Sequence, residues 1–193
     1  MISASGLGRR FGDRRVLSGV DFGLERGGFL LVTGPNGSGK TTLLRLLAGL
    51  LAPTEGALEI QADRRSTGFL GHEPLVYREL TALENLDLYG RLYRVSERRE
   101  RIGMLLERFG LWDARGEPVS TFSRGMLQRL ALCRTLLHDP ELLLLDEPFS
   151  ALDAGGAELL QAELTETAGR TVVVASHQPD RIAPHATQRL ALA

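Results

Sequence analysis

The sequence predicts an α/β protein with a mainly parallel sheet and an inserted group of helices. Short apolar runs typical of buried strands lie toward both ends of the chain, and a stretch of helical periodicity, about residues 81–138, separates them. A glycine-rich segment also follows one of these runs directly and opens a helical pattern. We expect the strands on the two sides of the helical stretch to join in one sheet.

The first part of the chain predicts four strands. An alternating apolar pattern between Val16 and Leu24 is partly strand-like, and residues 29–33 form a short apolar run typical of a buried strand. Two further short strands are expected at residues 57–61 and 67–70.

One helix is predicted in this part, at residues 41–50. Its end is indicated by Gly49, since glycine favours the end of a helix, and by Pro53, since proline does not continue one. The order strand, glycine-rich loop, helix brings loop amides and a helix N-terminus together, which suits a bound anion.

The middle of the chain predicts three helices. Residues 84–95 and 97–109 carry apolar side chains at three- and four-residue spacing, with arginine and glutamate on the other side. A third helix is predicted at residues 121–137, entered through Ser123. We expect these helices to form an α-helical subdomain.

Strands return after the helical stretch. Residues 142–146 form a fully apolar strand and residues 171–175 a valine-rich one, with a helix at residues 157–168 between them. Strands that alternate with helices favour parallel pairing.

Length and composition favour one compact domain that covers residues 1–193. The net charge of −1 argues against a nucleic-acid partner, because such proteins are usually strongly basic. The single Cys133 has no partner for an internal disulfide, which favours a reducing compartment. The first eight residues lack the apolar core of a signal peptide, and the apolar run 142–145 is too short to cross a bilayer. Any membrane role is therefore expected to depend on a partner.

Lys40 is the only lysine of the chain, and all the other Lys and Arg positions are arginine. Lysine is a compact point charge whereas arginine is a wide planar fork, so a tight loop around phosphates accepts only lysine. The surrounding segment matches G-x-x-x-x-G-K-[ST], the P-loop, in which amides and lysine hold phosphates and the hydroxyl binds Mg²⁺. The alternative is a glycine-rich turn without a ligand. The predicted nucleotide-binding residues are Gly34, Pro35, Asn36, Gly37, Ser38, Gly39, Lys40, Thr41 and Thr42, with Thr41 also a Mg²⁺ ligand.

Two acids end the apolar strand at residues 142–146. Asp146 is placed to bind the Mg²⁺ shell, since a hard cation prefers oxygen ligands. Glu147 is placed to polarise an attacking water. The alternative is a buried strand with ordinary acids at its exposed end, and the P-loop upstream favours the functional interpretation.

Residues 121–129, Thr-Phe-Ser-Arg-Gly-Met-Leu-Gln-Arg, lie shortly upstream of these acids and resemble the L-S-G-G-Q signature of ATP-binding cassette (ABC) ATPases. Phe122, Arg124 and Met126 depart from that pattern, whereas Ser123 and Gly125 keep it. The simpler interpretation is a capped amphipathic helix.

The resemblance implies an ABC ATPase fold with an N-terminal antiparallel β-subdomain. Residues 1–71 and 139–193 would form the catalytic core and about residues 72–138 the α-helical subdomain. It also implies that two copies bind ATP and Mg²⁺ at their interface. Ser123 and Gly125 of one copy would close over the γ-phosphate held by the P-loop of the other.

Smaller segments extend the resemblance. Residues 150–153, Ser-Ala-Leu-Asp, resemble the D-loop at the dimer interface, with Asp153 also a possible helix cap. His177, in Ser-His-Gln at residues 176–178, matches the switch histidine that contacts the γ-phosphate. Phe11 stands where an aromatic residue stacks on adenine, and core packing is its alternative role. The resemblance thus implies a catalytic set of Lys40, Glu147 and His177.

The loop after residue 70 departs from the family pattern. Counting back from Glu84 and Asn85 places His72 where the family has the glutamine of its Q-loop. A neutral histidine can hydrogen-bond a metal-bound water. Glu73 is an alternative member of the metal shell. The remaining possibility is that this loop only links the two lobes.

Within the family, residues 71–74, 80–86, 146–149 and 176–178 together resemble the ATP-binding subunit of cytochrome c maturation systems, often called the heme-exporter ATPase. This implies a separate integral-membrane permease, a place on the cytoplasmic face of the cell membrane, and no direct contact with heme. Three alternatives stay open: another small ABC exporter, a soluble ABC scaffold, and a small-molecule P-loop kinase.

Overall fold

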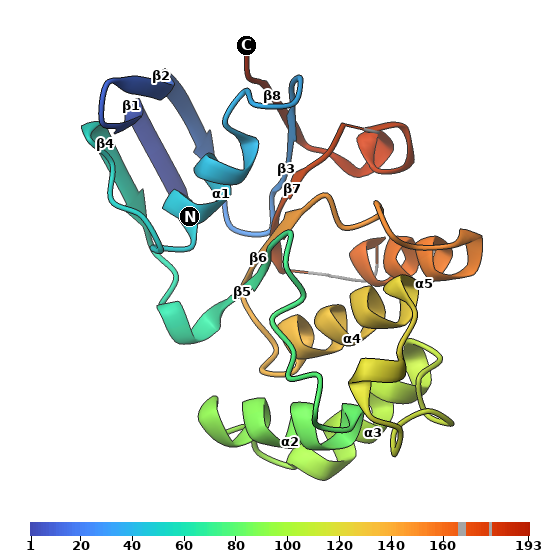
Figure 1. Ribbon diagram of the computed structural model, residues 1–193. Helices are drawn as coiled ribbons and strands as arrows, with labels where there is room; N and C mark the ends of the chain where they lie inside the picture. The colour runs from blue at the N-terminus through green and yellow to red at the C-terminus, as the bar shows by residue number, and fades with distance from the viewer. Residues whose placement is uncertain (166–168, 178) are drawn as a thin grey trace.

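The computed structural model describes residues 1–165, 169–177 and 179–193. The chain forms two β-sheets and a group of helices that lies below them in the view of Figure 1. Among the described residues, no helix has both the length and the apolar character needed to cross a membrane.

The N-terminal sheet is antiparallel and has the strand order β2-β1-β4. It contains β1 (Ile2–Phe11), β2 (Arg14–Leu24) and β4 (Glu55–Ile60). The antiparallel subdomain is therefore present, although the pattern in the sequence missed β1. This strand lies between the other two and pairs with both. Ile2 and Ala4 are buried and Ser3 and Ser5 exposed, but this alternation is confined to the start of the strand and is too short to mark it by itself.

One close approach fixes a glycine in this sheet. A Cβ atom on Gly56 would lie 2.3 Å from the carbonyl oxygen of Gly6, and the φ of Gly56 is 75°. Both the space and the left-handed conformation exclude a side chain there.

The second sheet is parallel and has the order β5-β6-β7-β3-β8. Its members are β3 (Phe29–Thr33), β5 (Thr67–Leu70), β6 (Leu142–Asp146), β7 (Thr171–Ala175) and β8 (Gln188–Ala191). The first four match the predicted bounds. Strand β8 was missed because its half-polar sequence gives no strand pattern, and its pairing with β3 defines it.

The α-helices begin and end close to the predicted positions. They are α1 (Lys40–Leu47), α2 (Ala82–Leu92), α3 (Arg98–Arg108), α4 (Arg124–Leu136) and α5 (Ala154–Thr165). Helix α1 ends before the predicted residue 50 because Gly49 has a left-handed φ of 66°. The last three residues of the predicted helix 157–168 lie outside the described residues. Helices α2, α3 and α4 all fall within the predicted subdomain, whose limits at residues 72 and 138 stay a prediction.

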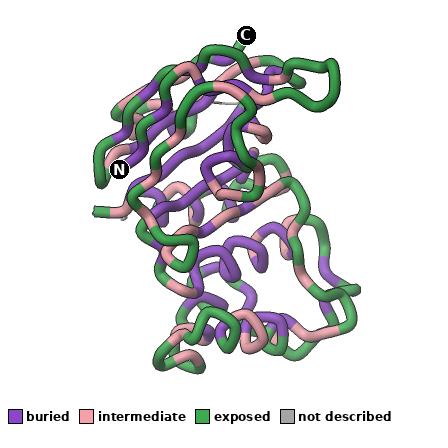
Figure 2. Tube along the Cα trace, turned by 90° about the vertical axis from the view of Figure 1, so that its left-hand side faces the viewer, coloured by how far each residue is buried: buried purple, intermediate pink, exposed green. Residues whose placement is uncertain are grey.

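The parallel sheet separates two apolar cores. In β6, Leu142 and Leu144 face one core, with α1 and the antiparallel sheet, whereas Leu143 and Leu145 face the other, with α2 to α5. Figure 2 shows this buried interior running through the centre of the molecule. Because both faces are covered, the strand is apolar throughout, as parallel strands usually are.

Candidate functional site

A glycine-rich loop, residues 34–39, joins β3 to α1. Gly34, Gly37 and Gly39 have φ values of 149°, 86° and 98°, which side-chain-bearing residues rarely adopt. A Cβ atom on Gly34 would also lie 2.5 Å from the carbonyl oxygen of Leu192. Glycine is therefore required for the loop to keep its shape beside β8 and α1.

Lys40 begins α1 and folds back over this loop. Its Nζ donates hydrogen bonds to the carbonyl oxygens of Gly34 at 2.8 Å and Pro35 at 3.1 Å, and the residue is only 7% exposed. The ammonium group is thus held within the loop.

Asp146 ends β6 beneath the start of α1. Burial raises the pKa of its carboxyl group, while a hydrogen bond from Thr41 lowers it in part. The residue is 3% exposed, and within the described chain its Oδ2 has no hydrogen-bond partner. A buried carboxylate oxygen without a partner, next to a hydroxyl, fits a hard cation such as Mg²⁺.

Glu147 and His177 meet where β6 and β7 end. The Oε2 atom of Glu147 accepts a hydrogen bond from the His177 amide at 3.2 Å and lies 2.7 Å from His177 Nδ1. Glu147 has a φ of 48°, and its amide donates to Ala175 O at 2.9 Å. This backbone conformation is uncommon for a residue with a side chain, and such residues are concentrated at functional sites. The neighbouring residue 178 lies outside the described residues.

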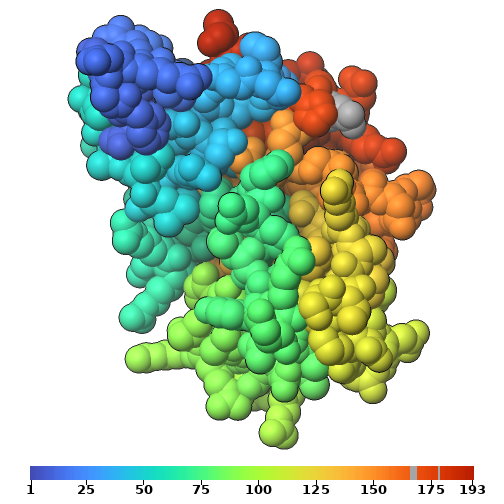
Figure 3. All heavy atoms as spheres, viewed as in Figure 1, coloured from blue at the N-terminus to red at the C-terminus, as the bar shows by residue number. Residues whose placement is uncertain are grey.

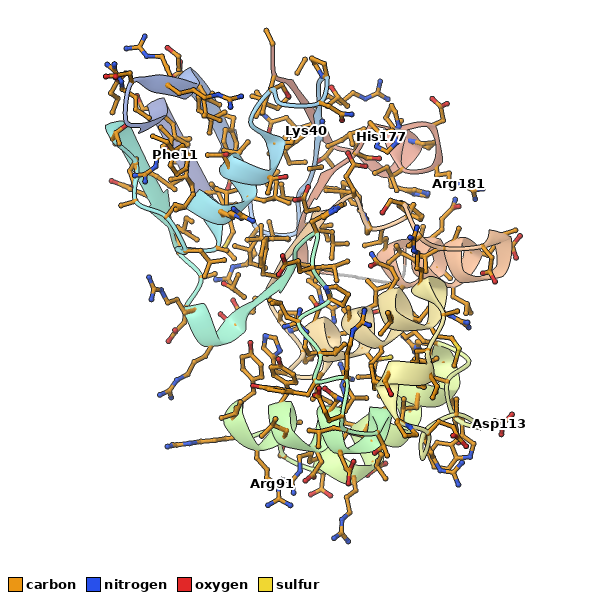
Figure 4. All side chains as sticks on the ribbon, viewed as in Figure 1. Phe11, Lys40, Arg91, Asp113, His177 and Arg181 are labelled. Carbon is orange, nitrogen blue, oxygen red and sulfur yellow. The ribbon has the colours of Figure 1, made fainter. Side chains whose placement is uncertain are left out.

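These side chains surround one open cavity of about 490 Å³. Its lining contains ten predicted site residues: Asn36, Gly37, Gly39, Lys40, Thr41, Thr42, His72, Asp146, Glu147 and His177. Gly34, Pro35 and Ser38 belong to the loop but not to the lining. Figure 4 shows Lys40 and His177 on neighbouring elements above the helical subdomain.

Phe11 and Glu73 also lie outside this cavity. Phe11 ends β1 and is 45% exposed, and its ring packs under the Arg9 guanidinium at 4.6 Å. In Figure 4 it lies on the antiparallel sheet, apart from Lys40. Glu73 is exposed and does not line the cavity, whereas its neighbour His72 does. Of the two candidates in that loop, the structure brings His72 to the site.

The signature segment lies at the start of α4, where Arg124 and Gln128 line a second cavity together with His72, Asp146 and Glu147. The Ser123 hydroxyl caps the helix by accepting from the Met126 amide at 3.2 Å. Beside it, Gly125 packs closely against the backbone. A Cβ atom at this position would lie 3.3 Å from the carbonyl oxygen of Ala151. Asp153 caps α5 through the Gly156 amide at 2.8 Å. Ser123, Gly125 and Asp153 do not line the cavity of their own chain.

Three further residues line the cavity without having been predicted as ligands: Arg14, Val16 and Ser150. Strand β2 contacts the loop directly. The Val16 carbonyl and the Leu17 side chain fill the space beside Gly39. No local pattern marks this contact, since it depends on how the two sheets pack. Ser150 had a signal, because it opens the segment that resembles the D-loop.

The strand, glycine-rich loop and helix, with Lys40 inside the loop and Asp146 beneath Thr41, define a P-loop nucleotide-binding protein. Comparison with known proteins narrows this class to one family. Residues 17–150 match the family model described as ABC transporter, and the chain belongs to this family.

Two curated relatives illustrate the range of similar proteins. A daunorubicin resistance ATP-binding protein, DrrA3 of Streptomyces coeruleorubidus, is 39% identical over 92% of this chain and 60% of its own length. A cytochrome c biogenesis ATP-binding export protein, CcmA of Nitrosospira multiformis, is 39% identical over 94% of this chain and 93% of its own. The chain spans less than two thirds of the length of some of these relatives.

Solved structures share the fold. One, described as the ATP binding subunit of an ABC transporter, has a TM-score of 0.91 at 27% identity and covers 99% of this chain and 85% of its own. Another, a dimeric post-hydrolysis state of the ATP-binding cassette MJ0796 bound to ADP and Pi, has a TM-score of 0.85 at 30% identity. The match covers 100% of this chain and 94% of the chain of that cassette. The ABC ATPase fold with its three parts is therefore confirmed.

Proposed function

We propose that this chain is the ATP-hydrolysing subunit of an ABC transporter. The observation that carries the proposal is the meeting of five side chains around one cavity. They come from α1, from the end of β6 and from the end of β7: Lys40, Thr41, Asp146, Glu147 and His177.

Each of these residues has a role that its position supports. The amides of the glycine-rich loop and Lys40 would bind the phosphates of ATP, and Thr41 and Asp146 would hold Mg²⁺. When bound, Mg²⁺ neutralises charge on the phosphate oxygens. Glu147 would orient the attacking water and accept its proton, and His177 would contact the γ-phosphate. The hydrogen bond between His177 and Glu147 holds both side chains at the cavity.

A second copy of the chain would complete the site. Ser123 and Gly125 lie outside the cavity of their own chain, on the exposed start of α4, as the composite arrangement requires. The similarity to a dimeric cassette with ADP and Pi supports this proposal.

A membrane permease is the proposed partner, and it would place the chain on the cytoplasmic face of the cell membrane. Leu75, Tyr77 and Leu83 are large apolar residues left exposed on the loop before α2 and on its first turn. In Figure 3 this green segment lies on the visible face of the molecule. Exposed apolar side chains grouped on one face are typical of a binding surface.

For the transported substrate we propose the cytochrome c maturation role, with heme handled by partner proteins. The CcmA relative supports this, because the similarity spans nearly the whole of both chains. A drug exporter is the second candidate, because the daunorubicin resistance relative has the same sequence identity to this chain as the CcmA relative, 39%.

Substitution of Glu147 tests the hydrolytic role. The Glu147→Gln variant is expected to bind ATP normally and to lose most hydrolysis, by about a hundredfold or more, because the amide cannot accept the proton from water. Phosphate release and ATP affinity, measured on the same preparation, separate the two effects. Near-normal turnover would remove Glu147 from this role.

Identification of the partner tests the transport role. The tagged chain is purified from membranes, and the proteins that come with it are identified. A permease of the cytochrome maturation type supports the first candidate, and a drug-exporter permease supports the second. A protein found without any membrane partner would favour the soluble scaffold instead.

A further inference from the structure

Residues 71–80 connect β5 to α2 and join two surfaces of the molecule. His72 lines the nucleotide cavity, whereas Leu75 and Tyr77 are exposed on the outer face. Figure 1 shows this segment descending from the end of β5 to α2. The contacts that hold residues 71–80 in place therefore decide where His72 lies.

Leu75 is the unusual residue of this segment. Its φ is 51°, in the left-handed region that leucine rarely adopts, and its side chain is exposed. Such a conformation costs of the order of 1 kcal/mol and persists only where surrounding contacts enforce it.

A side-chain contact to the backbone of Leu75 comes from Tyr89. The Tyr89 hydroxyl donates a hydrogen bond of 2.6 Å to the carbonyl oxygen of Leu75. Burial raises the pKa of Tyr89, so the hydroxyl keeps its proton at neutral pH. Tyr89 lies on the third turn of α2, a helix that is fixed to the rest of the subdomain by packing against α3 and α4.

Other residues anchor the segment on both sides of Leu75. Arg134 of α4 donates to the Phe69 carbonyl at 3.2 Å, and its guanidinium lies 5.3 Å from the centre of the Tyr89 ring. Asn85, fully buried, pairs with both the amide and the carbonyl of Tyr77 at 2.7 and 2.9 Å. Leu70 is the last residue of β5 and pairs with Leu145, so within the described chain residues 71–74 lie between the anchors. The Leu75 carbonyl is therefore the anchor nearest to His72 on its C-terminal side.

We propose that Tyr89 is a positioning residue for ATP hydrolysis: by holding Leu75 in its left-handed conformation, it sets the reach of His72 into the nucleotide cavity. Two residues separate His72 from Leu75, and one of them is Pro74, whose fixed φ stiffens the link. The inference rests on the proposed role of His72 at the metal-bound water. Tyr89 itself does not line the cavity.

The first experiment is a double-mutant cycle on ATP hydrolysis by the purified full chain with Mg²⁺. Tyr89→Phe is expected to lower kcat about fivefold, the effect of one lost hydrogen bond, with KM unchanged because the P-loop carries ATP binding. In a His72→Ala background the same substitution should have no further effect.

Tyr93→Phe is the matched control. Tyr93 follows α2 directly and stacks on His138, and in the described part of the chain its hydroxyl makes no hydrogen bond. This variant should keep the kcat of the original chain.

Substitutions at Leu75 test the same geometry without touching a buried residue. Leu75→Val should lower kcat as Tyr89→Phe does, because β-branched residues are the least tolerant of positive φ. Leu75→Asn should restore most of the kcat that Tyr89→Phe loses, since asparagine accepts this conformation, whereas Leu75→Ala should not.

A measurement without nucleotide completes the test. Hydrogen exchange of the amides at residues 71–73, 75 and 76 should be faster in Tyr89→Phe than in Tyr93→Phe. An equal loss of kcat with and without His72, or unchanged exchange, would overturn the inference. If His72→Ala alone leaves kcat intact while the exchange difference is present, the role given to His72 fails and the anchoring by Tyr89 stands.

Discussion

Lys40 shows how one residue type can be required at one position. Its ammonium group reaches two carbonyl oxygens of the loop while remaining 7% exposed. A planar guanidinium needs more room than this loop leaves. Apart from Lys40 and the histidines, every basic side chain of this protein is arginine. The lysine at this position therefore reflects the space in the site.

An exchange of lysine for arginine tests this explanation. Lys40→Arg keeps the charge but is expected to weaken ATP binding by about tenfold or more, the effect of losing a charge-assisted hydrogen bond. The reverse exchange Arg45→Lys, at an exposed position of the same helix, serves as the control and should leave affinity unchanged. Titration calorimetry with ATP measures both. Equal affinity for Lys40→Arg and the original chain would contradict the steric explanation.

At the scale of the element, the start of α2 depends on a reciprocal cap. The Glu84 amide donates to Thr81 Oγ1 at 3.1 Å, and the Thr81 amide donates to Glu84 Oε2 at 2.8 Å. This is the capping box, and its sequence pattern, threonine followed three residues later by glutamate, is visible in the chain. That signal places the helix start at Ala82, two residues earlier than apolar spacing alone predicted.

Removal of the Thr81 hydroxyl is expected to destabilise the protein in a pH-dependent way. Thr81→Ala should lower the free energy of unfolding by about 1 kcal/mol at pH 7. Hydrogen bonds from the Thr81 amide and hydroxyl lower the pKa of Glu84 in the folded state. The stabilisation is therefore present above the unfolded pKa, roughly 4.3, and is lost as the pH falls through the lower folded pKa.

The effect of Thr81→Ala should accordingly be smaller at pH 3 than at pH 7 in urea unfolding. Thr165→Ala is the control, because the Thr165 hydroxyl bonds carbonyl oxygens of its own helix and no carboxylate. A larger effect of Thr81→Ala at pH 3 would show that Glu84 does not depend on this cap.

At the scale of the whole molecule, ion pairs join the helical subdomain to the core. Glu163 of α5, 8% exposed at its side chain, contacts Arg108 of α3 and Arg170 before β7. Arg170 also reaches Asp139, which contacts Arg101 of α3. Of these pairs, only that between Glu163 and Arg170 is buried on both sides, at 8% and 15% side-chain exposure. Loss of one partner from a buried pair is costly, because the remaining charge loses compensation.

Removal of Arg170 is expected to weaken the whole fold. Arg170→Ala should lower the free energy of unfolding by about 2 kcal/mol, the effect of one lost hydrogen bond to a charged group, because the buried Glu163 carboxylate keeps only its pair with Arg108. Arg26→Ala breaks an exposed pair with Glu141 and should cost less than about 1 kcal/mol. Urea unfolding followed by the fluorescence of Trp112, the only tryptophan, compares the two. Similar losses for both variants would remove the special role of the buried network.

The sequence by itself determined the family motifs and most of the elements of this protein. The P-loop, the acids after the apolar strand and the strands at residues 29–33, 67–70, 142–146 and 171–175 are local patterns. Their residue types and spacing are sufficient to define them, because backbone conformation and strand burial follow from neighbouring residues.

Only the tertiary structure decided which residues share the cavity. It brought His72 and Arg14 to the lining, left Phe11 and Glu73 outside it, and formed β1 and β8 by pairing. These outcomes depend on contacts between segments far apart in the chain. Local patterns at these residues are short or missing, so the packing of the two sheets and the helical subdomain defines their place.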